Sequence, residues 1–259
     1  MTSSRTTFKL LLGIVILACV SLPSVQAAPT LDLSTAGSSG FVKGAYFAQD
    51  GNGSSGTGTI HSFVRISTND GIEQGYNTDW RPIELGFNMN NSPTFTRSLL
   101  LSDVPIVNKG GIDYREFRLD INQSNGSHAL LSLDAIEIYL AASGSLTGYP
   151  ALGTKIFDLD GPTSDNWILL NGDLVAGSGG GQDMTAFIPD SLFVGGDYVY
   201  LYSKFGASEG SLHPNNDGFE EWSVRKDVLP PPPVPVPSAL LLAAMGSHLA
   251  IWFHRRKPA

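Results

Sequence analysis

The strongest constraint on this chain is a short-range alternation of apolar and polar residues. The segment 113–121, DYREFRLDI, shows it most clearly, because successive side chains switch between the two classes. A period of two places alternate side chains on opposite faces of a β-strand. No segment between residues 41 and 228 shows the 3.6-residue period of an amphipathic helix. The central part of the chain is therefore predicted to be all-β.

Short segments of this kind recur, and turn signals rich in Gly, Asn, Asp and Ser separate them. We predict an antiparallel β-sandwich or jelly roll over 41–228, preceded by a leader at 28–40 and followed by a short C-terminal transmembrane helix. About nine strands are expected, at residues 41–48, 59–66, 94–101, 113–121, 131–140, 155–159, 167–170, 197–205 and 219–225.

The charge balance excludes one class of function. The chain has 16 Lys and Arg against 24 Asp and Glu, and five of the basic residues lie in its two end segments. The part between the ends is therefore strongly acidic. Nucleic-acid binding needs a basic face that displaces counterions from phosphate, so no nucleic-acid partner is expected.

The first 27 residues have the pattern of a signal peptide. Arg5 and Lys9 precede an apolar run, LLLGIVILACV, which is too short to span a bilayer comfortably. Val25 and Ala27 are the small residues that signal peptidase requires, so cleavage is expected between Ala27 and Ala28. The pattern therefore predicts that the protein is exported.

Two alternatives to this cleavage remain. The apolar run can stay uncleaved as an anchor, or Cys19 can be lipidated, because the residues before it loosely resemble a bacterial lipobox. Cys19 is the only cysteine. After cleavage at Ala27 the mature chain would have no disulfide and would depend on its core alone.

The C-terminal end has a second processing pattern. A proline-rich linker at 229–237 favours an extended polyproline II conformation. An apolar stretch at 240–253 follows, and Arg255 and Arg256 stand in the basic cluster behind it. This order predicts a membrane-inserted tail whose positive end stays cytoplasmic.

The tail, at 234–259, resembles the PEP-CTERM sorting domain of Gram-negative bacterial surface proteins. Val234, Pro235, Pro237 and Ser238 match the family motif, with Val236 in place of the usual Glu. The resemblance implies processing by an exosortase, passage through the inner membrane and release to the cell surface in an organism that makes extracellular polysaccharide. A plain membrane anchor is the alternative.

One acidic turn is a candidate metal site. Asp158, Asp160 and Asp165 place hard oxygen atoms in a single short segment, and Ca²⁺ binds six to eight such oxygens. The spacing is not that of an EF-hand. Asx turns, in which the side chains bind the nearby backbone, explain the same residues without a metal. Calcium is the one cofactor that the sequence suggests.

Two catalytic-looking motifs lack their structural context. GNGSSG at 51–56 leads into a strand pattern and not into the helix that a dinucleotide site requires. GASEG at 206–210 is likewise followed by a loop, whereas a nucleophile elbow enters a helix. The histidines at 61, 128 and 213 are too scattered for a zinc motif. No catalytic residue is assigned.

Several aromatic residues stand out: Trp80, Trp167, Trp222 and the tyrosine row Tyr198, Tyr200 and Tyr202. They could fill the core of the sandwich, or they could form a platform on which sugar rings stack. Paired carboxylates could also perform glycosidic chemistry, but Glu220 and Glu221 are adjacent on a strand and point to opposite faces.

The leading hypothesis is a non-enzymatic, exported cell-surface or matrix protein associated with extracellular polysaccharide. Its partners would be signal peptidase, exosortase, the membrane before processing, and polysaccharide. A carbohydrate-binding jelly roll stabilised by calcium is the first alternative, and a polysaccharide-acting enzyme is the second.

Overall fold

A computed structural model of the chain describes residues 28–49, 60–68, 71–124, 126–174, 182–207, 213–216 and 218–226. The predicted signal peptide, proline-rich linker and sorting tail lie outside these ranges. Across the ranges described, no helix has the length and apolar character needed to cross a membrane.

Within the described residues, seven strands form the first sheet. Its main path is β1–β11–β9–β13–β5, with β10 beside β9 and β6 beside β13. The pairs are antiparallel except β1 with β11. The strands are Leu31–Asp32 (β1), Glu73–Tyr76 (β5), Leu99–Leu100 (β6), Leu130–Ala141 (β9), Thr154–Asp158 (β10), Ile168–Asn171 (β11) and Tyr198–Phe205 (β13).

The second sheet also has seven strands in these ranges. Its path is β2–β3–β12–β8–β14–β4, with β7 beside β8, and every pair is antiparallel. The strands are Ser39–Val42 (β2), Ala45–Ala48 (β3), Ile60–Ile66 (β4), Ile106–Lys109 (β7), Ile112–Asp120 (β8), Met184–Pro189 (β12) and Glu220–Arg225 (β14).

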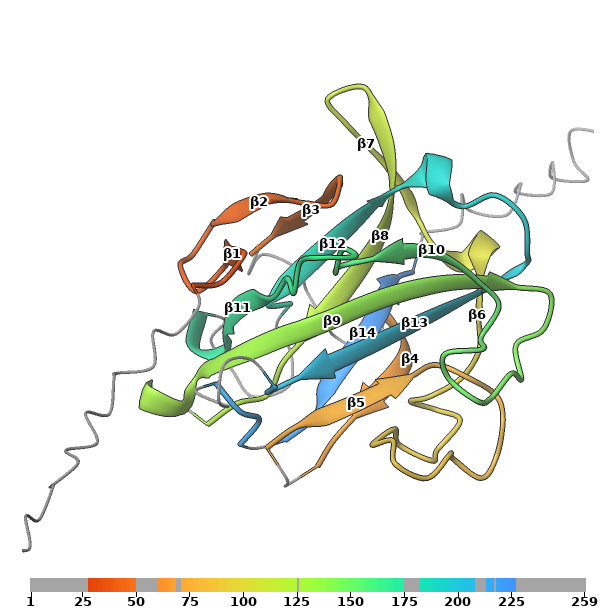
Figure 1. Cartoon of the computed structure of the whole chain (residues 1–259), viewed down its shortest axis with the longest axis horizontal. Coiled ribbons are helices and arrows are strands. Elements are labelled where there is room, and N and C mark those ends of the chain that lie inside the picture. Colours follow the sequence, from red (N-terminus) through yellow and green to blue (C-terminus); the bar gives the residue numbers. More distant parts are fainter. Residues whose placement is uncertain are drawn as a thin grey trace, which may run out of the picture.

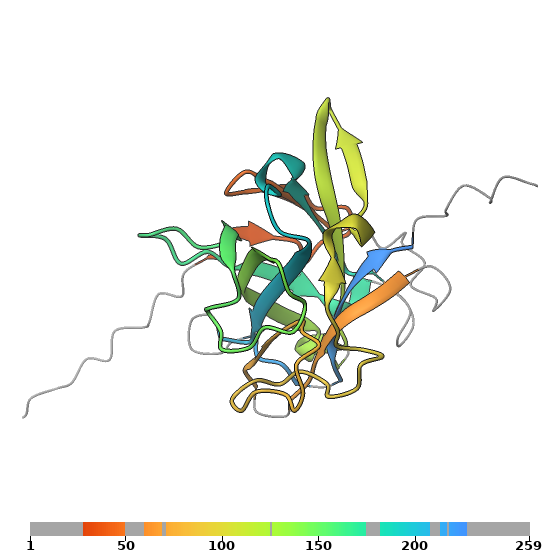
Figure 2. The same cartoon turned by 90° about the vertical axis from the view of Figure 1, so that its right-hand side faces the viewer.

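Eight of these strands pair in a nested order. β4 pairs with β14, β5 with β13, β8 with β12 and β9 with β11. Successive pairs alternate between the second sheet and the first. Figures 1 and 2 show the two sheets as two layers, beyond which the β7–β8 hairpin projects. The nested order brings chain segments from distant parts of the sequence to the same end of the molecule.

The core lies between the two sheets. On β9 the buried side chains of Ile136 and Ile138 belong to it, and on β13 those of Val199 and Leu201. Phe63, Phe117 and Leu119 are the fully buried contributions from the second sheet. One polar contact joins the layers, because the buried indole Nε1 of Trp222 on β14 donates to Ser203 Oγ on β13 at 3.0 Å.

The predicted all-β class is confirmed, and the fold has two sheets. The only helical segments in the described part of the chain are short 3₁₀ turns: Leu101–Asp103 (η1), Gly126–His128 (η2), Gly172–Leu174 (η3) and Asp190–Leu192 (η4). Ile136, Ile138 and Leu140, which were expected to share one face of a strand, are all buried in the core, and Tyr139 between them is buried as well.

The prediction of one strand over 41–48 was wrong. The segment is a hairpin of β2 and β3 in which Val42 pairs with Ala45. Lys43 and Gly44 both have positive φ, 52° and 83°. This is the backbone of a two-residue type I′ turn, whose twist suits tight hairpins.

Two other boundaries differ from expectation. Only Leu99–Leu100 of the predicted strand 94–101 is extended and paired, because the Ser92 carbonyl accepts hydrogen bonds from the amides of Phe95 and Thr96 in a turn. The expected leader 28–40 contributes β1 and the start of β2 to the fold. Leu33 is fully buried, which explains why this segment packs on the sheets.

The packing between the sheets yields a stability prediction. We expect Trp222→Ala to lower the free energy of unfolding by about 3–5 kcal/mol, because it leaves a large cavity and removes the bond to Ser203. Urea denaturation measures the change. Leu85→Ala is the control, since Leu85 is 96% exposed and its truncation should cost less than about 0.5 kcal/mol. Equal effects of the two substitutions would contradict the core assignment.

Candidate functional site

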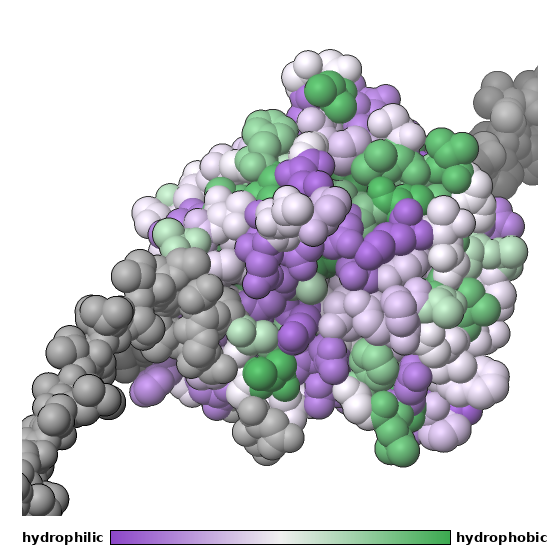
Figure 3. All heavy atoms as spheres, in the orientation of Figure 1, coloured by the Kyte–Doolittle hydropathy of each residue, from purple (hydrophilic) through white to green (hydrophobic). Residues whose placement is uncertain are grey.

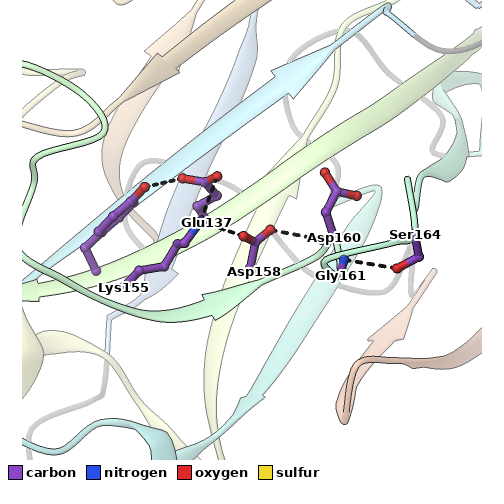
Figure 4. Close-up of polar contacts among 7 residues, drawn as sticks. Glu137, Lys155, Asp158, Asp160, Gly161 and Ser164 are labelled. Carbon is purple, nitrogen blue, oxygen red and sulfur yellow. Dashed lines mark hydrogen bonds and ion pairs between the residues drawn. The ribbon is translucent and has the colours of Figure 1, made fainter.

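The acidic turn after β10 is held together by its own side chains. Asp158 Oδ1 accepts the Asp160 amide at 3.0 Å, and Asp160 Oδ1 accepts the Asn166 amide at 2.7 Å. The Gly161 amide donates to Ser164 Oγ at 3.0 Å, closing the turn (Figure 4). Each of these contacts is a side chain binding a backbone N–H two to six residues away. The turn is therefore ordered by Asx-type capping.

A lysine on β10 joins this turn to β9. Lys155 Nζ lies 2.6 Å from Asp158 Oδ2 and 3.3 Å from Glu137 Oε1 (Figure 4). The hydrogen bond to Asp158 raises the pKa of Lys155 above its ordinary value. Desolvation raises the pKa of Asp160. The row Glu137–Lys155–Asp158 is thus a fixed set of charged groups on one surface.

The three predicted calcium ligands lie in the same turn. Two of them, Asp158 and Asp160, already form hydrogen bonds within the protein. Asp158 binds Lys155 and the Asp160 amide, and Asp165 is exposed beyond them. Nowhere in the described residues do three or more His, Cys, Asp or Glu side chains form a group suited to a metal. Capping accounts for the positions of Asp158 and Asp160.

A groove opens beside this turn. It has a volume of about 490 Å³ and brings Lys43, from the β2–β3 turn, close to the acidic segment. Its remaining lining is Ile156, Phe157, Asp158, Asp160, Gly161, Pro162 and Leu192. The groove therefore combines apolar surface with two carboxylates and one ammonium group. Hydrophilic side chains also gather across the middle of the face on which the first sheet lies (Figure 3).

One member of the tyrosine row, Tyr202, packs in a cluster with two tyrosines from outside the row. Tyr149 stacks on Tyr202 with ring centroids 4.1 Å apart, and it meets Tyr139 edge-on at 6.5 Å. Burial raises the pKa of Tyr202 to about 12. Trp167 and Trp222 are buried as well, whereas Trp80 is 47% exposed. These rings are core residues, except Trp80.

A second groove offers fewer free groups. It lies between η1 and the start of β13, and Arg115 is its basic residue. The Arg115 guanidinium already binds Asp190 Oδ1 at 2.6 Å and the carbonyls of Leu101 and Val104. This groove is therefore a weaker candidate for binding a polar ligand.

A group of carboxylates lies at one end of the fold, where β5, β12 and β14 begin and β8 ends. Sequence reasoning considered only two of them, Glu220 and Glu221, and missed the rest. We call this group the acidic end, and it consists of Glu73, Asp120, Asp183, Glu220 and Glu221. Glu221 pairs in register with Asp120 and forms an ion pair with Arg65. Glu220 points the other way and is fully buried, as expected for adjacent strand residues.

Burial raises the pKa of three of these acids. Desolvation raises the pKa of Glu73 to about 8 and that of Asp183 to about 8. It also raises the pKa of Asp120 to about 7, with the Glu221 charge as a second cause. No pattern in the sequence identified them, because they are distant along the chain.

A glycine allows the loops at this end to meet. Gly206 has φ +77°, and a Cβ atom there would collide with the carbonyl oxygen of Gly71. The Asn215 amide donates to that same oxygen at 2.9 Å. The GASEG segment therefore begins with a glycine needed for close packing between loops.

The three histidines lie in different parts of the fold. His61 lies on β4, His128 in η2, and His213 packs against Trp167 with ring centroids 6.2 Å apart.

Comparison with protein-family models, curated proteins and solved structures found no match for this chain.

The raised pKa values predict how stability depends on pH. Between the unfolded pKa near 4 and the folded pKa near 8, the folded state holds more protons at Glu73 than the unfolded state. Stability must therefore fall as pH rises through this window. Urea denaturation in EDTA at pH 5 and pH 8 measures the loss, roughly 1.4 kcal/mol for each unit of pKa difference.

Glu73→Gln removes this titration, so its stability should fall less between the two pH values. Asp103→Asn is the control, because Asp103 is an exposed acid, and it should follow the unaltered protein. An identical pH dependence in all three proteins would contradict the shift at Glu73.

The close loop contact predicts a large effect of a single methyl group. We expect Gly206→Ala to destabilise the fold by at least about twice as much as Gly37→Ala. Both glycines have similar positive φ, +77° and +75°, but open space surrounds Gly37. The left-handed backbone alone costs a non-glycine residue about 1–2 kcal/mol. Thermal denaturation of the two variants measures the difference, and equal melting temperatures would contradict the contact.

Proposed function

We propose that this chain is an exported, non-enzymatic cell-surface or extracellular-matrix protein that is sorted by an exosortase and associates with extracellular polysaccharide. The signal-peptide pattern at 1–27 and the PEP-CTERM-like tail at 234–259 support export and sorting. The acidic middle of the chain is consistent with a partner other than nucleic acid.

We further propose that the two-sheet domain is a carbohydrate-binding jelly roll. The nested pairing of β4–β14, β5–β13, β8–β12 and β9–β11 supports this topology, because a jelly roll places its first and last strands side by side. Its connections cross between the sheets and gather loops at the two ends.

The groove beside the acidic turn is the observation that carries the binding proposal. Its size lies within the range of small-molecule sites. Asp158 and Asp160 can accept hydrogen bonds from sugar hydroxyls, and Lys43 can donate them. Leu192 and Pro162 add apolar surface for the C–H face of a sugar ring. Lys155 and the turn amides hold the carboxylates in place before a ligand arrives.

The same geometry favours binding over hydrolysis. A glycosidase needs one carboxyl group that gives up a proton to the leaving group. Glu137 and Asp158 both bind the Lys155 ammonium group, and Asp158 also accepts the Asp160 amide, so both carboxyl groups already serve as hydrogen-bond acceptors. An enzymatic role would be supported instead if product release were abolished by one carboxylate substitution.

Affinity electrophoresis through gels containing polysaccharide from the host tests the proposal. We expect the protein to be retarded, and Lys43→Gly to weaken the retardation roughly tenfold or more, because a hydrogen bond to a charged group contributes about 1.5–3 kcal/mol. Glycine suits the positive φ at this position, so the turn should be retained.

Lys109→Ala provides the matched control. It removes the same charge from an exposed lysine whose Nζ lies 4.0 Å from the Phe187 ring centroid, outside the groove. Equal weakening by both substitutions would point to a general charge effect. Absence of retardation of the unaltered protein would contradict polysaccharide binding.

A further inference from the structure

A buried network of hydrogen bonds links four polar residues that are far apart in the sequence. Asn215 Nδ2 donates to Glu73 Oε2 at 2.8 Å, and Gln123 Nε2 donates at 3.0 Å to both Asn215 Oδ1 and Glu220 Oε1. The Thr68 amide donates to Glu73 Oε2 as well, at 3.2 Å. The strands β5 and β14 and the segment after β8 supply these groups. The network therefore sits inside the acidic end.

Three oxygen atoms of this network have no hydrogen-bond partner. They are Glu73 Oε1, Glu220 Oε2 and Gln123 Oε1, and all three are buried. Both glutamates are fully buried, and Gln123 is 8% exposed. Buried polar atoms in folded proteins nearly always have partners, so three unpaired acceptors in one network require an explanation. The Gln123 oxygen is an amide oxygen, so the deficit is not confined to the acids.

The two glutamates also lack a positively charged partner. Within the described residues neither Glu73 nor Glu220 forms a salt bridge, whereas the nearby Glu221 pairs with Arg65. A buried charge without a partner is costly, and breaking its compensation destabilises a fold. A cation would satisfy both requirements at once, since it neutralises charge and accepts oxygen ligands.

We propose that Glu73, Glu220 and Gln123 bind a calcium ion at the acidic end of the fold. The available donors are carboxylate and amide oxygens, which Ca²⁺ prefers, and they include no nitrogen or sulfur ligand that would favour zinc or copper. Calcium accepts ligands at 2.3–2.6 Å in a flexible geometry, so carboxylate groups at the ends of different strands can share it. This site is separate from the acidic turn of Asp158, Asp160 and Asp165.

Protonation alone does not account for the network. Burial raises the pKa of Glu73 to about 8, which allows its carboxyl group to carry a proton at neutral pH. That proton can join Glu73 to one other oxygen of the three, and the remaining oxygen would still lack a partner. A calcium ion can contact several oxygen atoms at once, so it could serve all three.

Calcium titration of the purified full-length protein tests the site. After removal of metals by EDTA, we expect the melting temperature to rise by roughly 3–5 °C for each tenfold increase in calcium above the dissociation constant. Isothermal titration calorimetry should give one calcium per chain. The double variant Glu73→Gln, Glu220→Gln should lose both responses.

The double variant also keeps the test informative if folding is affected. Neutral amides cannot ionise in this buried site, so in EDTA at pH 8 this variant should melt at or above the temperature of the unaltered protein. Asp158→Asn with Asp160→Asn is the matched control, because it removes two carboxylates from the acidic turn, and it should keep the calcium response. Loss of the response in that control, or its absence in the unaltered protein, would overturn the proposal.

Discussion

The packing of the two sheets against each other is the constraint on which the rest of the molecule depends. Cys19 is the only cysteine in the chain, so no intramolecular disulfide can stabilise the domain. Its stability depends instead on apolar side chains between the layers, with Trp222 and Ser203 as a buried polar link. The nested pairing follows from this requirement, because each crossing of the chain between sheets places another apolar face on the core. The same pairing brings Glu73, Gln123 and Glu220 together, although they are far apart in sequence.

The sequence predicted those strands whose two faces differ in polarity. β8, β9, β13 and β14 were expected within a residue or two of their observed bounds, because alternation is strong where one face is apolar. β12, with the sequence MTAFIP, was missed because nearly all its residues are apolar and no alternation of polarity remains. The hairpin at Lys43 was missed because a type I′ turn places a lysine in a left-handed conformation that it rarely adopts. Local hydrogen bonds in turns explain the short strand β6.

The two candidate sites differ in how far the sequence could reveal them. The acidic turn is continuous along the chain, so Asp158, Asp160 and Asp165 were recognisable as one group, and Asx capping was already an open interpretation. The contribution of Lys43 to the groove required the fold, since the β2–β3 turn reaches it from more than one hundred residues away. Of the acidic end, only Glu220 and Glu221 were candidates from the sequence, because the other members lie at the ends of strands that are far apart along the chain. A binding groove on one surface and a cation site at one end would together suit a domain that holds polysaccharide outside the cell.

Export and sorting are the central claim of this account, and the mature termini test them most directly. Intact-mass spectrometry of the protein from its native host, with and without the exosortase, would measure both ends of the chain. We predict a mature N-terminus at Ala28, and loss of the tail near Pro237 only in cells that have the enzyme. A chain that keeps Ala259 in both backgrounds would contradict sorting and leave the tail as a simple membrane anchor.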